Sequence, residues 1–296
     1  MNTTFGRFVP HLWLAAMIAI WGGSYAVVKA SLGALPPFTV IAVRFWVAAL
    51  CLLPFALVGP RRDWRTALGP GLIAGCALAI GYNLQTLGMQ YTSASLAGFL
   101  AGLIVPLVAI GGCLFFRARF GLWSATGLLL AVFGMALLCW PEPGAPNRVL
   151  GVVLQLIATV SYVAHILLLS HFGSSMPTAP FCTWQMVVVA LVGSACLPFE
   201  PSLVENAAAN WTLPAVLLLG YLAVLASALG VGVQARVQHR IPPMHLALLF
   251  ALQPLFAAFF GWLTLGERLG TMQLVGGASI VAGVVVTSLE RAAASP

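Results

Sequence analysis

The stretch PPFTVIAVRFWVAALCLLPFALV, residues 36–58, contains a single charged residue, Arg44. A helix of about 20 apolar residues crosses the hydrocarbon core of a membrane, because each residue adds ~1.5 Å to its length. Within that core the backbone must satisfy its own hydrogen bonds, which a helix does. Residues 36–58 are therefore predicted to form a transmembrane helix.

Apolar stretches of this kind run along almost the whole chain of 296 residues. Only 6% of the residues are charged and 61% are hydrophobic, so a soluble fold would lack polar surface. We expect an all-α membrane protein with ten transmembrane helices. The predicted spans are residues 11–32, 36–58, 67–91, 93–116, 122–140, 149–172, 177–199, 213–236, 243–264 and 271–289.

Composition and motifs argue against several other classes. The basic residues are scattered in short loops, so the net charge of +7 indicates a membrane surface rather than nucleic acid as a partner. The six cysteines lie in apolar stretches without CxxC spacing, and we interpret them as small buried residues, with no metal or cofactor expected. HExxH, GxSxG and P-loop motifs are absent from the sequence, which argues against an enzyme.

The positions of Lys and Arg predict the orientation. A cytoplasmic N-terminus leaves only Arg148 and Arg268 outside, with Lys29 and Arg44 inside spans. We therefore expect both termini on the cytoplasmic side of the cell inner membrane. The basic residues placed inside are Arg7, Arg61, Arg62, Arg65, Arg117, Arg119, Arg236, Arg240 and Arg291.

The chain also repeats itself. Pro106 aligns with Pro254. After one inserted residue, the same alignment matches Gly127 with Gly276 and Gly134 with Gly283. A weaker match between the two halves pairs Ser24-Tyr25 with Ser161-Tyr162. Five spans per half is an odd number, so the second half must enter the membrane inverted, as in many secondary transporters. We expect a first repeat at 1–140, a periplasmic linker at 141–148, a second repeat at 149–290 and a cytoplasmic tail at 291–296.

Several short motifs resemble the EamA-type branch of the drug/metabolite transporter superfamily. They are WGGSY at 21–25 with Lys29, Arg44-Phe45, YTSAS at 91–95 leading to Pro106, and Gly266-Glu267-Arg268 followed by Gln273, Gly276 and Gly283. The resemblance implies ten helices in two inverted five-helix repeats, alternating access and export of metabolites. Within the branch, the chain is most similar to the YddG-type exporters of aromatic and other amino acids.

Polar and aromatic side chains recur at helical spacing and are too polar to face lipid. We expect them to line a small-molecule site inside the bundle, with interhelical packing as the alternative for any one residue. Such a lining suits partly apolar solutes, and its π faces tolerate organic cations. The candidate substrate-binding residues are Trp21, Tyr25, Arg44, Tyr82, Gln85, Tyr162, His165, Trp184 and Gln253, with Gln155, Thr159 and Ser227 nearby.

The two cations within spans differ in depth. Lys29 is about one turn from a span end and can reach the interface. Arg44 lies ~10 Å below the end of its span, where a cation must face protein, water or an anion. Arg44 either holds span ends in place or binds a substrate carboxylate, and Glu267 is a plausible partner for either cation.

Acidic residues all fall in loops or at span ends, which favours a facilitator over an ion-coupled pump. His165 and His245 leave proton coupling open, so a proton-coupled exporter of drugs or organic cations is the alternative. A channel or a receptor is the alternative from another class. Pro106 and Pro254 lie mid-span, and we expect both to kink their helices and act in gating.

Overall fold

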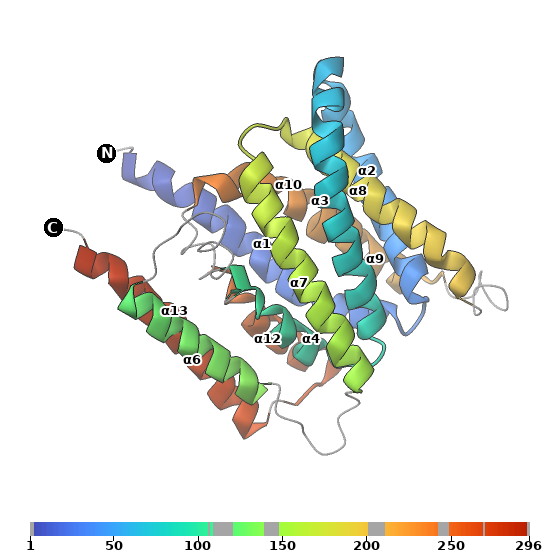
Figure 1. The fold of residues 1–296 in the computed structure, drawn as a ribbon. Helices are drawn as coiled ribbons and strands as arrows, with labels where there is room; N and C mark the ends of the chain where they lie inside the picture. Colours follow the sequence, from blue (N-terminus) through green and yellow to red (C-terminus); the bar gives the residue numbers. More distant parts are fainter. Residues whose placement is uncertain are drawn as a thin grey trace.

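The computed structural model describes residues 3–105, 107–108, 121–138, 148–200, 211–241, 249–268 and 270–294, and within these ranges the regular structure is entirely helical (Figure 1). The α-helices are α1 Thr3–Ser31, α2 Pro37–Leu57, α3 Arg61–Gly88, α4 Ala94–Ala101, α6 Leu122–Leu138, α7 Val149–Phe172, α8 Thr178–Cys196, α9 Leu213–Gly220, α10 Gly230–Val237, α12 Gln253–Leu265 and α13 Thr271–Ala294. The 3₁₀ turns are η1 Leu197–Phe199 and η4 Gln238–Arg240, and η3 Tyr221–Leu229 is a π-helical segment that joins α9 to α10.

Six described helical segments are long and apolar enough to cross a membrane: Val9–Ser31, Pro37–Leu57, Arg61–Gly88, Val149–Phe172, Thr178–Phe199 and Leu213–Arg240. Shorter apolar helices cover Ala125–Gly134, Gln253–Leu265 and Thr271–Gly283. The chain is therefore an all-α, multi-pass membrane protein. The fourth, fifth and ninth predicted spans extend into residues outside the described ranges.

Predicted and observed boundaries agree closely for α2, α7 and α8. Two helices begin earlier than predicted, α1 at Thr3 and α3 at Arg61. Charged residues in the first turns of α3 made that segment resemble a loop, but an Asp in a first turn is favourable to a helix.

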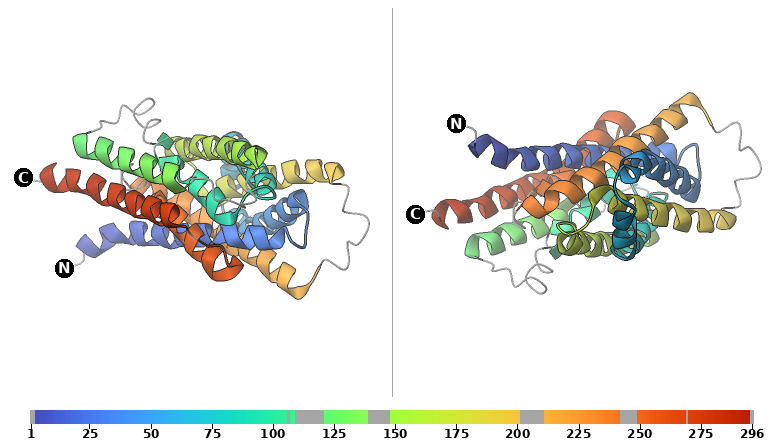
Figure 2. Two further views of the ribbon diagram at one scale, coloured as in Figure 1. Left: turned by 90° about the horizontal axis from the view of Figure 1, so that it is seen from below. Right: turned by 90° about the horizontal axis from the view of Figure 1, so that it is seen from above.

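Helices α6 and α13 lie side by side along one flank of the bundle (Figures 1 and 2). A Cβ atom on Gly134 would lie 2.5 Å from the carbonyl oxygen of Gly276, and one on Gly283 would lie 2.5 Å from that of Gly127. These are the glycines that the sequence repeat matches, and they contact each other reciprocally. The later residue of one helix meets the earlier residue of the other, so the pair is antiparallel.

The remaining helices pack in a pattern that also relates the two halves of the chain. Helix α2 packs on α8 and α4 packs on α12, so helices at matched positions pair with each other. The contact between α1 and α12 corresponds to the contact between α7 and α4. In the same way, the contact between α3 and α8 corresponds to the contact between η3 and α2. Small residues also let α3 approach α8 closely, because Cβ atoms on Gly71 and Gly75 would meet Trp184 and Val188 at 2.7 and 2.9 Å.

Turns interrupt the helical structure just before the two mid-span prolines. Helix α4 ends at Ala101, and the amide of Leu103 donates to the carbonyl of Leu100 in a tighter turn. Residues 251–252 form a turn, and Pro254 lies in the first turn of α12, where its missing N–H is not needed. The expected kink at Pro254 is therefore wrong in detail, and Pro106 lies outside the described residues.

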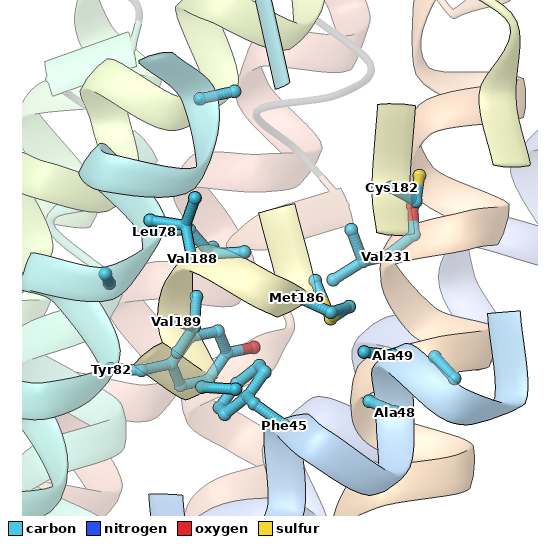
Figure 3. Packing of buried hydrophobic residues seen from close by; sticks show 14 of the residues in the cluster. Phe45, Ala48, Ala49, Leu78, Tyr82, Cys182, Met186, Val188, Val189 and Val231 are labelled. Carbon is cyan, nitrogen blue, oxygen red and sulfur yellow. The ribbon is translucent and has the colours of Figure 1, made fainter. Parts of the chain in front are cut away.

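One core cluster lies between α2, α3, α8 and α10, where Phe45 and Tyr82 lie side by side (Figure 3). The outer surface carries large exposed apolar side chains such as Phe55 and Leu129, as a lipid-facing surface requires. Cys182 is buried as expected, but Cys76 is exposed on α3, so that interpretation is wrong for Cys76.

Candidate functional site

A cavity lies between the two halves of the chain. Its lining comes from α1, α3, α7 and α10 and from the segments around the interrupted helices. Most of the sequence-predicted site residues meet here. The lining residues are Trp21, Ser24, Tyr25, Leu78, Tyr82, Gln85, Ile104, Tyr162, His165, Ile166, Val231, Gln234, Phe250 and Gln253.

A hydrogen-bonded network joins the tyrosines of the two halves. Tyr162 Oη donates to Gln85 Oε1 at 3.0 Å, and Gln85 Nε2 donates to Tyr25 Oη at 3.0 Å. Gln253 Nε2 also approaches Tyr25 Oη, at 3.4 Å. Gln155 does not line the cavity but supports the network, because its Nε2 donates to the backbone carbonyl of Gln85 at 2.8 Å. The side chains of Tyr25 and Tyr162 are therefore linked through one amide.

The cavity walls rely on two glycines that each precede a cavity glutamine by one turn. A Cβ on Gly81 would lie 2.5 Å from the ring of Tyr162, and one on Gly230 would lie 2.7 Å from the indole of Trp21. Trp21 is held further by its Nε1, which donates to the carbonyl of Ala226 at 2.7 Å. Gly-x-x-x-Gln occurs at 81–85, 151–155 and 230–234, and each of these glutamines lines the cavity or supports its network, a signal that could have identified Gln234 from sequence.

His165 is buried and bound to a neutral partner. Its Nε2 lies 2.7 Å from Gln185 Oε1, while Gln185 Nε2 donates to the carbonyl of Phe181. That arrangement makes Nε2 the protonated nitrogen of the ring. The partner of His165 is an amide and not a carboxylate, and His245 lies outside the described residues.

Arg44 lies behind the cavity wall rather than in it. Its side chain is only 2% exposed, and its Nε donates to Ser227 Oγ at 2.7 Å. The guanidinium carbon lies 4.6 Å from the ring centroid of Tyr82 and 4.9 Å from that of Phe45. Its Nη2 has no hydrogen-bond partner in the described part of the chain.

Trp184 is the predicted site residue that the structure places away from the cavity. Its ring meets Trp64 edge to face at 5.4 Å, and its Nε1 donates to the carbonyl of Trp64 at 3.2 Å. It therefore joins α8 to the first turns of α3. The next residue, Gln185, is the one that reaches toward the site, through His165.

Three charged side chains bind helix ends at one end of the bundle, which we call the charged end. Lys29 Nζ donates to the carbonyls of Met89 and Thr92 at 2.6 and 2.7 Å. The carboxylate of Glu267 accepts from the amides of Ala94 and Ser95, both at 2.9 Å, and from Ser95 Oγ. The carboxylate of Glu200 accepts from the amides of Phe38 and Thr39 and from Thr39 Oγ1.

Glu267 attracts Lys29 electrostatically, but its carboxylate hydrogen-bonds to the first turn of α4 rather than to Lys29 or Arg44. A carboxylate at the N-terminus of a helix is stabilised by the free N–H groups of the first turn, and both acidic residues use this site. The sequence did contain a signal for the start of α4, because Ser93 is a common N-cap residue and precedes the apolar run of the helix. In the structure, Ser93 Oγ caps α4 by accepting from the amide of Leu96.

Several proteins of known sequence are similar to this chain over most of its length. An uncharacterized transporter of Archaeoglobus fulgidus is 29% identical over 283 residues, which cover 96% of this chain and 87% of the relative. The probable amino-acid metabolite efflux pump of Escherichia coli is 25% identical over 287 residues, covering 91% of each chain. The uncharacterized transporter YdfC of Bacillus subtilis is 24% identical and covers 93% of this chain and 89% of its own.

The fold is also that of a protein with a solved crystal structure, with a TM-score of 0.71 and 17% identity over 96% of this chain and 98% of that one. At that identity the likeness concerns the fold alone. The model of the EamA-like transporter family matches residues 9–140 and again residues 149–289. The chain therefore belongs to the EamA-like transporter family.

Proposed function

We propose that this membrane transporter exports amino acids, aromatic ones among them, or related small amphiphilic metabolites across the cell inner membrane. The observation that carries the proposal is the meeting of Tyr25 and Tyr162 at Gln85, in a cavity between the two halves. Its lining combines aromatic side chains with a few polar groups, as small-molecule sites do. The name of the E. coli relative supports the same class of solute.

The mechanism proposed is alternating access by ten transmembrane helices in two inverted repeats, 1–140 and 149–290, with both termini cytoplasmic. The reciprocal, antiparallel contacts of Gly134 with Gly276 and of Gly127 with Gly283 support the inversion. Rocking of such halves exposes a site near the midplane to each side in turn. The charged end would then be the periplasmic end, because it holds Arg148 and the 266–268 loop, which the basic-residue pattern places outside.

We propose that transport is facilitated rather than proton-coupled. The described lining of the cavity contains no carboxylate, and His165 is bound to the amide of Gln185. Proton or sodium coupling in membranes usually relies on an ionisable group in the pathway. The solute would then leave the cell down its own gradient.

Radiolabelled amino-acid flux in proteoliposomes tests this function. We expect saturable uptake of an aromatic amino acid, reduced at least tenfold by Tyr82→Ala, Tyr162→Ala or His165→Leu in folded protein. Tyr91→Ala is the matched control, because Tyr91 packs against Arg148 outside the cavity. An unsaturable conductance would instead indicate a channel, and accumulation above equilibrium under a pH gradient would contradict the facilitator.

A further inference from the structure

The charge of Arg44 has no opposite charge beside it in the described part of the chain. Of the described acidic side chains, Glu200 and Glu267 bind helix N-termini, and Asp63 lies in the first turn of α3. Glu200 binds Thr39, which at 1.5 Å per residue is ~7.5 Å from Arg44 along α2. Arg44 instead contacts a hydroxyl and two aromatic rings.

This charge is close to the solute site. Tyr82 lines the cavity, and the guanidinium carbon of Arg44 lies 4.6 Å from the centroid of its ring. A solute charge on the cavity side of that ring would be about 8 Å from Arg44. With an effective dielectric constant of about 20, such a separation changes the affinity of a unit charge by roughly 30-fold.

The aromatic faces that would otherwise attract an organic cation are partly occupied. Arg44 covers one face of Tyr82, and Tyr162 meets the same ring edge to face at 5.4 Å. Trp21 stacks against Phe250 with the rings 8° from parallel. The cation–π attraction of a solute cation to the lining is therefore weakest near Tyr82, where Arg44 repels that cation most strongly.

We infer that Arg44 sets the charge selectivity of the cavity, admitting carboxylate-bearing solutes that are zwitterionic or anionic and excluding organic cations. The inference rests on the proposed function and narrows its substrate class. Arg44 acts through the wall of the cavity, because Tyr82 lies between the guanidinium and the solute. The described acidic side chains lie elsewhere, so no neighbouring carboxylate neutralises the guanidinium.

Direct binding to the purified protein in detergent tests the inference without requiring transport. The probes are radiolabelled L-phenylalanine, 3-phenylpropionate and 2-phenylethylamine, which share a phenyl group and differ in charge. We expect the amine to bind at least tenfold more weakly than both carboxylates. Equal or tighter binding of the amine, or no binding of any probe, overturns the inference.

Substitutions of Arg44 test whether the selectivity of binding comes from the charge of its guanidinium. Arg44→Gln should bring the three affinities within about threefold of one another, while Arg44→Lys should keep the discrimination. Arg65→Gln is the matched control, because Arg65 is an exposed cation on α3.

If Arg44→Gln fails to fold, Ser227→Ala is the second variant. It keeps the charge of Arg44 while removing the hydroxyl that Arg44 binds, and loss of discrimination in that variant would contradict a role of charge alone. Selective binding without flux in proteoliposomes would reject the proposed function and leave the charge selectivity standing.

Discussion

The two ends of the bundle are held together by different chemistry. At the charged end, Lys29, Glu200 and Glu267 each bind backbone groups at the ends of other helices. At the opposite end, the amide of Gln238 on η4 donates to the carbonyl of Ile166 and to Ser170 Oγ on α7. The arginines of that end, Arg61, Arg62, Arg65, Arg236 and Arg240, are exposed.

The two ends differ in this way although helices at corresponding positions of the two halves pack against each other. Hydrogen bonds to charged groups contribute about 1.5–3 kcal/mol each, and bonds between neutral groups about 1 kcal/mol. A carrier that alternates must break the links at each end in turn. The charged end should therefore be the harder end to open, and the resting protein should favour the conformation in which it is shut.

Glu267→Gln should show the largest effect. The substitution removes the negative charge that binds the first turn of α4, and we expect the free energy of unfolding to fall by about 3 kcal/mol. Thermal unfolding in detergent measures the loss. Arg268→Gln, at the exposed neighbouring residue, is the control and should leave the melting temperature unchanged. Equal stability of the two variants would remove the distinction between the ends.

Lys29→Met should show a smaller loss. The side chain keeps its length but no longer donates to the carbonyls of Met89 and Thr92, and we expect about 1.5 kcal/mol of destabilisation. Lys29→Arg should recover most of it, since the cation is retained. A Met variant as stable as the wild type would mean that these carbonyls are satisfied in another way.

Gln238→Leu, at the opposite end, should lose only about 1 kcal/mol, because the bonds involved are neutral. His239→Ala, on the exposed side of the same turn, is its control. Should Gln238→Leu prove as destabilising as Glu267→Gln, the charged and neutral ends would not differ in strength.

Sequence periodicity could predict which face of a helix points inward, but not which neighbour that face would meet. Tyr82 and Gln85 lie about one turn apart on α3, and both line the cavity as predicted. Trp184 and Gln185 are adjacent, so they point in different directions, and only the packing of α8 against α3 decides which of them is near the site. The partner of Glu267 was missed for the same reason, because a helix N-terminus competes with Lys or Arg for a carboxylate only in three dimensions.

The most direct test of alternating access is the distance across each end, measured by double electron–electron resonance with spin labels in a background without the six native cysteines. One pair of labels, at Gln90 and Arg268, reports the charged end, and another, at Arg65 and Arg236, reports the opposite end; all four positions are exposed. We expect wild-type protein to show mainly the short distance at the charged end. Glu267→Gln should shift that pair to longer distances and the opposite pair to shorter ones. Distances that lengthen together at both ends, or that do not respond to Glu267→Gln, would contradict a carrier whose ends open in alternation.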